Sequence, residues 1–149
     1  MVKAIPEGYH TITPYLVVEN PGRLIDFLTR AFGARETERI AQPDGSIMHA
    51  EVRIGDSAVM MGGAGSQHPA KLAGLYLYVE DVDAAYAKAL QAGATSITAP
   101  ADQFYGDRSA GVTDPAGNTW WIATHIEDVP REQLASRAEA AMKQHRGGA

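Results

Sequence analysis

The chain repeats one pattern of strand, helix and turn signals at a spacing of about 61 residues. Residues 16–20 and 32–34 in the first half, LVVEN and FGA, reappear as LYVED at 77–81 and AGA at 92–94 in the second half. A duplicated unit of this kind usually cannot bury its apolar face alone, so the two halves are expected to pack together. The cleft between them is then the natural place for a ligand.

Each half is predicted to hold a strand, a helix and three further strands. Apolar residues recur at helical spacing in both halves, with Leu24, Phe27, Leu28 and Ala31 in the first and Val82, Ala85, Tyr86 and Ala89 in the second. β-branched residues, alternation with a period of two, and turns rich in Gly, Pro and Asp predict the strands at residues 9–18, 36–41, 47–54, 58–61, 74–79, 95–98, 107–113 and 119–124.

These elements predict an α+β fold made of two βαβββ modules with paired, curved mixed sheets. We expect one domain over residues 1–149, since 149 residues suit a single core. The first module covers about 9–62, the linker 63–71 and the second module about 72–125. A charged, alanine-rich stretch then predicts a C-terminal helix over about 129–144.

Composition excludes several classes of function. The net charge of −5 provides no basic surface for nucleic acid. The chain has no cysteine, which removes disulfides, thiolate catalysis and cysteine-bound zinc. The sequence begins without the apolar region of a signal peptide, and no apolar run approaches the length of a membrane-spanning helix. We therefore expect a cytoplasmic protein with neither a nucleic-acid nor a membrane partner.

The order of elements, the DPxGN turn at residues 114–118 and the IDF sequence before FGA in the first helix resemble the vicinal oxygen chelate superfamily. This superfamily includes glyoxalases, bleomycin-resistance proteins and dioxygenases. The YGDR sequence at 105–108 and the IATHIED sequence at 122–128 are similar to its PhnB-like branch. The resemblance implies the glyoxalase-type fold, but the fold hosts both metal enzymes and pure binders.

Metal-dependent relatives place one His or Glu ligand on each of four strands. The resemblance puts Thr13 at the first of these positions, Val59 or Met61 at the second, Gly74 at the third and Trp121 at the fourth. None of these residues is a competent ligand, since the family's metals bind imidazole or carboxylate groups here. We therefore expect no metal at these positions and no cofactor.

Strand parity predicts what fills the concave face instead. The aliphatic residues that should face the helices are Ile12, Leu16, Val18, Leu75, Leu77 and Val79. The opposite parity lines the concave face with aromatic rings and a few polar groups, a common composition of small-molecule pockets. The alternative is that these rings simply plug the cavity. The residues predicted to bind a ligand are Thr13, Tyr15, Glu51, Met61, Tyr76, Tyr78, Arg108 and Trp121.

Three residues are candidates for acid–base catalysis. His49 and Glu51 lie two apart on one predicted strand and could point together, as an acid–base pair or as two ligands of a relocated metal. Tyr105 could cap the mouth of the pocket. Arg108 either binds an anionic ligand or pairs with Glu51, because the parity of its strand is ambiguous. His125 is interpreted as a hydrogen-bonded structural residue.

The leading hypothesis is a family member that lacks the usual metal ligands and binds a small aromatic or hydrophobic molecule. The alternative is a glyoxalase-like lyase or isomerase, with a relocated metal or with metal-free acid–base catalysis, so the sequence leaves open whether the protein is an enzyme. Relatives often dimerise and build each cavity from modules of two chains. The resemblance therefore also implies a homodimer, and the unpaired module edges need covering.

Overall fold

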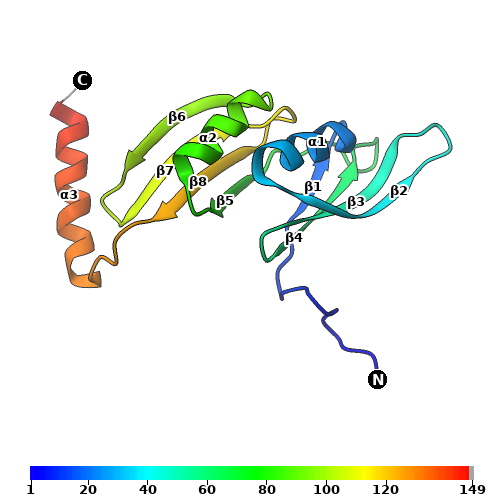
Figure 1. Cartoon of the computed structure of the whole chain (residues 1–149), viewed down its shortest axis with the longest axis horizontal. Coiled ribbons are helices and arrows are strands. Elements are labelled where there is room, and N and C mark those ends of the chain that lie inside the picture. The colour runs from blue at the N-terminus through cyan, green and yellow to red at the C-terminus, as the bar shows by residue number, and fades with distance from the viewer. Residues whose placement is uncertain (148–149) are drawn as a thin grey trace.

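The duplicated pattern folds into two modules that lie side by side along the long axis of the molecule (Figure 1). The computed structural model describes residues 1–147. The first module contains β1 (Tyr15–Val18), α1 (Pro21–Phe32), β2 (Arg35–Ala41), β3 (Ile47–Ile54) and β4 (Ser57–Gly63). The second contains β5 (Gly74–Tyr78), α2 (Val82–Gln91), β6 (Thr95–Asp102), β7 (Asp107–Thr113) and β8 (Thr119–His125). Helix α3 (Arg131–Gly147) follows.

Each module forms its own four-stranded mixed sheet. The strand order is β1-β4-β3-β2 in the first module and β5-β8-β7-β6 in the second. In both, the first strand pairs in parallel with the fourth, and the other pairs are antiparallel. The predicted α+β fold with two βαβββ modules and a C-terminal helix is therefore confirmed.

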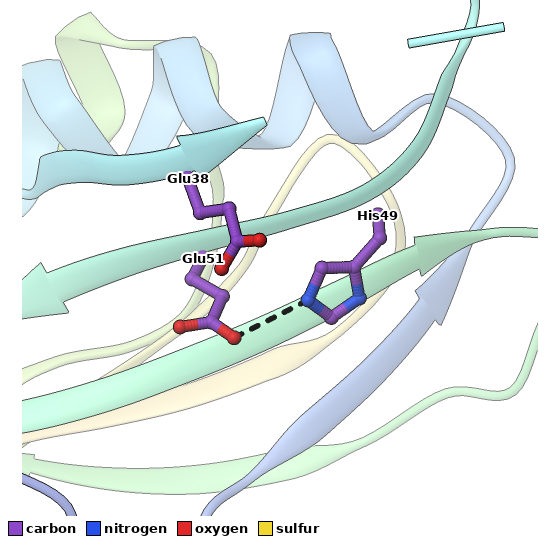
Figure 2. A group of neighbouring side chains, drawn as sticks. All are labelled: Glu38, His49 and Glu51. Carbon is purple, nitrogen blue, oxygen red and sulfur yellow. Dashed lines mark hydrogen bonds and ion pairs between the residues drawn. The ribbon is translucent and has the colours of Figure 1, made fainter. Parts of the chain in front are cut away.

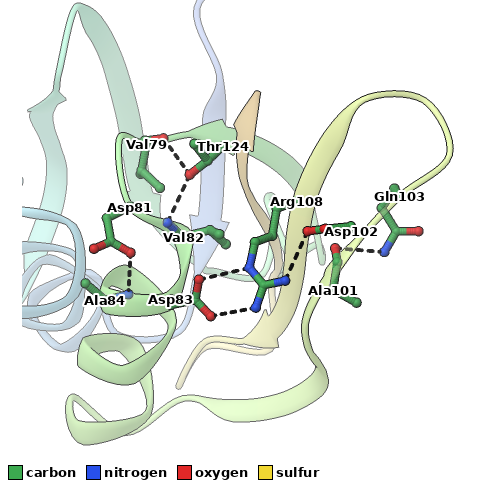
Figure 3. Close-up of polar contacts among 10 residues, drawn as sticks. All are labelled: Val79, Asp81, Val82, Asp83, Ala84, Ala101, Asp102, Gln103, Arg108 and Thr124. Atoms are coloured by element: carbon green, nitrogen blue, oxygen red, sulfur yellow. Dashed lines mark hydrogen bonds and ion pairs between the residues drawn. The ribbon is translucent and has the colours of Figure 1, made fainter. Parts of the chain in front are cut away.

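The helices begin and end at the residues that the sequence signals indicate. The Asn20 side chain accepts a hydrogen bond from the backbone N–H of Arg23, and Pro21 opens α1. Gly33 ends α1 in the left-handed region, with φ of 67°, which glycine adopts without strain. In the second module Asp81 caps α2 through the N–H of Ala84 (Figure 3).

The core lies between each sheet and its helix and continues from one module to the other. Leu24, Phe27 and Leu28 of α1 are almost completely buried over alternate residues of β3. Contact between the modules runs through α1 and α2, and the Phe32 ring lies 5.2 Å from the ring of Trp120 in β8. The helices thus hold the modules together and leave the other face of each sheet uncovered.

The first strand is shorter than predicted. We expected a strand over residues 9–18, but β1 begins at Tyr15, directly after Pro14, whose ring removes a backbone donor. Ile12 was expected to face the helix layer and is instead 84% exposed in the irregular segment before β1. None of the described helices is long and apolar enough to cross a membrane.

Candidate functional site

The face of each sheet opposite its helix, here called the open face, carries most of the candidate residues. Alternation along β5 sends Leu75 and Leu77 toward the helix and leaves Tyr76 and Tyr78 on the open face, 45% and 61% exposed. Trp121 stands beside Tyr76 in the register of β8 and is 38% exposed. In the single chain these rings form an uncovered aromatic surface and do not fill a closed core.

A buried carboxylate lies among these rings. Asp107, at the start of β7, is 2% exposed, and its Oδ2 atom accepts hydrogen bonds from the hydroxyls of Tyr76 at 2.8 Å and Tyr78 at 2.9 Å. Its Oδ1 atom lies 2.8 Å from Nδ1 of His125. Burial alone would raise the pKa of Asp107, but these hydrogen bonds outweigh it and leave the pKa lowered. Asp107 is therefore an ionised acceptor held by three donors.

His125 links this carboxylate to a second one. Its Nε2 atom lies 2.7 Å from Oδ1 of Asp128, so the imidazole is placed between two carboxylates. The hydrogen bonds to Asp107 and Asp128 raise the pKa of His125 above its usual value. Two donors are required to satisfy both acceptors, and this arrangement favours the doubly protonated ring. The expectation that His125 is hydrogen-bonded is confirmed.

Tyr105, a predicted catalytic candidate, lies at the edge of this group. Its hydroxyl is 3.5 Å from that of Tyr76, and its ring is 37% exposed. Burial, followed by the hydrogen bonds to Tyr105 and Asp107, raises the pKa of Tyr76, so its phenol stays protonated as a donor. Asp107 takes up the hydroxyl protons of Tyr76 and Tyr78, so the open face of the second module offers a flat ligand rings for stacking and phenolic oxygens that can accept hydrogen bonds.

The open face of the first module carries a separate polar cluster. Nε2 of His49 lies 3.3 Å from Oε1 of Glu51, and Nδ1 of His49 lies 3.4 Å from the hydroxyl of Tyr15. Glu51 is 6% exposed, and it also accepts a hydrogen bond from the Tyr9 hydroxyl. The predicted residues His49, Glu51 and Tyr15 are thus brought together, but on a different sheet from Tyr76, Tyr78 and Trp121.

Two residues predicted to bind a ligand are placed elsewhere. Met61 is completely buried, in one core cluster with Leu24 of α1, and the neighbouring Met60 pairs with Glu51 in the register of β3 and β4. The placement of Met61 on the concave face was therefore wrong. Thr13 lies half-buried in the segment that precedes β1, outside the sheet.

Arg108 faces the helix side of its sheet. Its guanidinium makes two hydrogen bonds with the Asp83 carboxylate of α2, at 2.9 and 3.0 Å, and one with Asp102 of β6 at 3.0 Å (Figure 3). Both suggested roles, the anionic-ligand contact on the concave face and the pairing with Glu51, were wrong. The ion pairs instead connect β7 to the helix and to the neighbouring strand.

Asp107 and Tyr9 belong to the polar groups on the open faces, although neither was among the predicted site residues. A parity signal for Asp107 was present: Ala110 and Val112 are apolar, so Asp107 belongs to the opposite face, together with Ser109. Tyr9 had no comparable signal, because it reaches Glu51 from an irregular segment 42 residues away in the chain.

Comparisons with known proteins agree with this architecture. The family model for the glyoxalase/bleomycin resistance protein/dioxygenase superfamily matches residues 8–122. An uncharacterized protein of Mycobacterium bovis, Mb0911c, is 37% identical over 148 residues, which cover 92% of this chain and 95% of that protein.

Solved structures share the fold. TioX from Micromonospora sp. ML1 is 27% identical, with a TM-score of 0.69 over 78% of this chain and 99% of that one. A PhnB protein from Bacillus cereus, described as a putative 3-demethylubiquinone-9 3-methyltransferase, is 16% identical, with a TM-score of 0.64 over 77% of this chain and 99% of that one. At that identity the second likeness concerns the fold alone.

Proposed function

The chain belongs to the glyoxalase/bleomycin resistance protein/dioxygenase superfamily, and from this membership and its open aromatic sheet face we propose that it binds a small aromatic or hydrophobic molecule. The observation that carries the proposal is the exposure of Tyr76, Tyr78 and Trp121 beside the buried, ionised Asp107. Flat rings offer a large contact area to a planar ligand. The hydrogen-bonding groups beside them would fix its orientation.

The proposed binding does not use a metal at the four positions that the family resemblance implies. Val59 and Met61 belong to the buried core, Gly74 has no side chain, and the indole of Trp121 has no free lone pair for a metal. Thr13, in the segment before β1, offers only a hydroxyl. The ligands expected at such a centre are imidazole or carboxylate groups, so this set does not fit one.

We further propose that the cavity is completed by a second copy of the chain. Strands β1 and β5 are edge strands, and the open faces expose Tyr15, Tyr76 and Tyr78 to solvent in the single chain. Exposed edges and apolar patches are usually covered in a stable protein. A homodimer that places the first module of one chain against the second module of the other would enclose the rings.

Substitution of Trp121 by alanine tests the binding proposal. A planar anionic dye, 8-anilinonaphthalene-1-sulfonate, and a panel of uncharged planar aromatics serve as probes in calorimetric titrations. Loss of the indole should weaken binding by ~1–3 kcal/mol, as expected for removal of an aromatic anchor. Phe104→Ala is the matched control, because Phe104 has similar exposure, 37%, but lines a groove against α3.

The proposal predicts that Phe104→Ala leaves the affinity for these probes unchanged. Equal affinities of the wild type and Trp121→Ala, with circular dichroism showing an intact fold, would contradict it.

A further inference from the structure

A second group of chemically active side chains lies on the open face of the first module, apart from the aromatic surface. Alternation along β3 places His49 and Glu51 on this face, because Ala50 and Val52 fill the core below. In the register of β2 and β3, Glu38 stands directly opposite Glu51. Figure 2 shows the two carboxylates and the imidazole directed toward one another from these adjacent strands.

The geometry of the three side chains suits a shared ligand. One donor atom from each of Glu38, His49 and Glu51 lies within 4.8 Å of the other two. Donor atoms around a metal ion with bonds of about 2.0–2.2 Å lie roughly 3–4 Å apart, so small changes of side-chain torsion would bring these three to bonding distance. Both backbones belong to paired strands, with a register shift in β2 between Glu36 and Glu38.

The charges in the group also favour a bound cation. Glu51 is 6% exposed and has Tyr9 and His49 as its hydrogen-bond partners. Among residues 1–147, neither nearby arginine forms an ion pair with Glu38 or Glu51: Arg39 pairs with Glu36, and Arg53 donates to the carbonyl of Gly8 and lies over the Tyr9 ring. Two neighbouring carboxylates without a cation repel each other, and the repulsion is stronger where one of them is buried.

We propose that Glu38, His49 and Glu51 form a binding site for a divalent first-row metal ion of the zinc or manganese type. One imidazole nitrogen and two carboxylate oxygens are a donor set that such ions accept. Three protein ligands leave further coordination positions, which face the open side of the sheet. The Tyr9 hydroxyl orients the Glu51 carboxylate, as hydrogen-bonded neighbours of metal ligands commonly do.

The other histidine–carboxylate group among residues 1–147 does not provide such a site. The ring of His125 uses Nδ1 for Asp107 and Nε2 for Asp128, so the imidazole separates the two carboxylates. In the Glu38 group, by contrast, one donor atom of each of the three side chains lies within 4.8 Å of the other two. This difference makes His125→Gln a matched control.

The test titrates metal-stripped protein with Zn²⁺ or Mn²⁺ alone. Calorimetry measures the binding of both ions, and the loss of the electron paramagnetic resonance signal of free Mn²⁺ measures the binding of that ion a second time. The wild type should bind one ion per chain. His49→Gln and Glu38→Gln should each weaken binding by about 10- to 100-fold or more, whereas His125→Gln and Glu36→Gln should leave it unchanged. Because no organic ligand is present, this result is independent of the aromatic-binding proposal.

Addition of Co²⁺ to the metal-stripped protein gives a second readout, an absorption spectrum that reports on the groups bound to the ion. A cobalt spectrum with bands from an imidazole-bound ion should appear with the wild type and with His125→Gln, and it should be lost with His49→Gln. No binding by the wild type, or equal binding by the His49 and wild-type proteins, would overturn the site. The proposal would also be overturned if His125→Gln were the one variant that lost binding, because the ion would then lie in the second module.

Discussion

Trp121 packs so closely on the backbone of Gly111 that a Cβ atom at position 111 would lie 2.8 Å from Cε3 of the indole. The first module has a counterpart, in which a Cβ atom at Gly62 would lie 2.7 Å from the hydroxyl oxygen of Tyr15. In each sheet an aromatic side chain of the open face thus lies against a neighbouring strand at a glycine. Because glycine has no side chain, the aromatic ring can pack directly against the backbone of the neighbouring strand.

Gly111→Ala should therefore displace the Trp121 ring and destabilise the fold by about 1–3 kcal/mol, the usual cost of forced overpacking. The shift of the ring should change the tryptophan emission and weaken binding of the aromatic probes. Urea denaturation followed by tryptophan fluorescence measures the stability and the emission, and calorimetric titration measures the affinity for the probes. Gly74→Ala is the control on the same sheet, because a Cβ atom there meets no atom within 4 Å. Equal stabilities of the two variants would contradict the close contact.

His125 should make stability depend on pH. Its pKa is raised by Asp107 and Asp128, so its contribution is fully present below the ordinary value of 6.5 and is lost as the pH rises through the folded-state value. The difference in unfolding free energy between the wild type and His125→Gln should be larger at about pH 5.5 than at about pH 9. Urea denaturation at both values measures it. A difference that grows with pH would contradict this assignment.

Asp114 should matter far more than a turn residue normally does. Its two carboxylate oxygens accept hydrogen bonds from Nε1 of Trp120 at 2.8 Å, from the side chain and backbone of Asn118, and from the backbone of Ala116. Asp114→Asn turns an amide group toward two of these donors, so we expect a loss of about 3 kcal/mol in the free energy of unfolding. Asp44→Asn in the exposed turn of the first module should change it little.

The proposed homodimer can be checked by light scattering during gel filtration. At micromolar concentration the wild type should show twice the chain mass of 15.9 kDa. Tyr78→Glu places a charge on the uncovered face and should shift the population toward the monomer, while Tyr86→Phe, on α2, should not. A monomeric wild type contradicts the dimer.

The sequence predicted elements well where one physical signal dominated. The predicted strand at residues 47–54 has the same bounds as β3, because polar and apolar residues alternate there and one face packs on the core. The face of β4 could not be read in the same way, since Val59, Met60 and Met61 are all apolar and a period of two is invisible. Met61 was assigned to the wrong face for this reason.

Contacts between residues far apart in the sequence could not be predicted either. The preference of Arg108 for Asp83 depends on how α2 crosses the sheet, and strand parity alone does not contain that information. The Tyr9–Glu51 contact depends on the path of an irregular N-terminal segment. In the second module the group of Asp107, Tyr76 and Tyr78 follows once the register of β5, β8 and β7 is known.

The two halves of the duplication have kept one scaffold and acquired unlike surfaces. The first carries a histidine and glutamates on β2 and β3, whereas the second carries tyrosines, an indole and an aspartate on β5, β7 and β8. In the proposed dimer each chamber would have one wall of each type. An elongated ligand would then bind in one orientation, with one end at each type of wall. A dimer with twofold symmetry would bind two such ligands in opposite orientations.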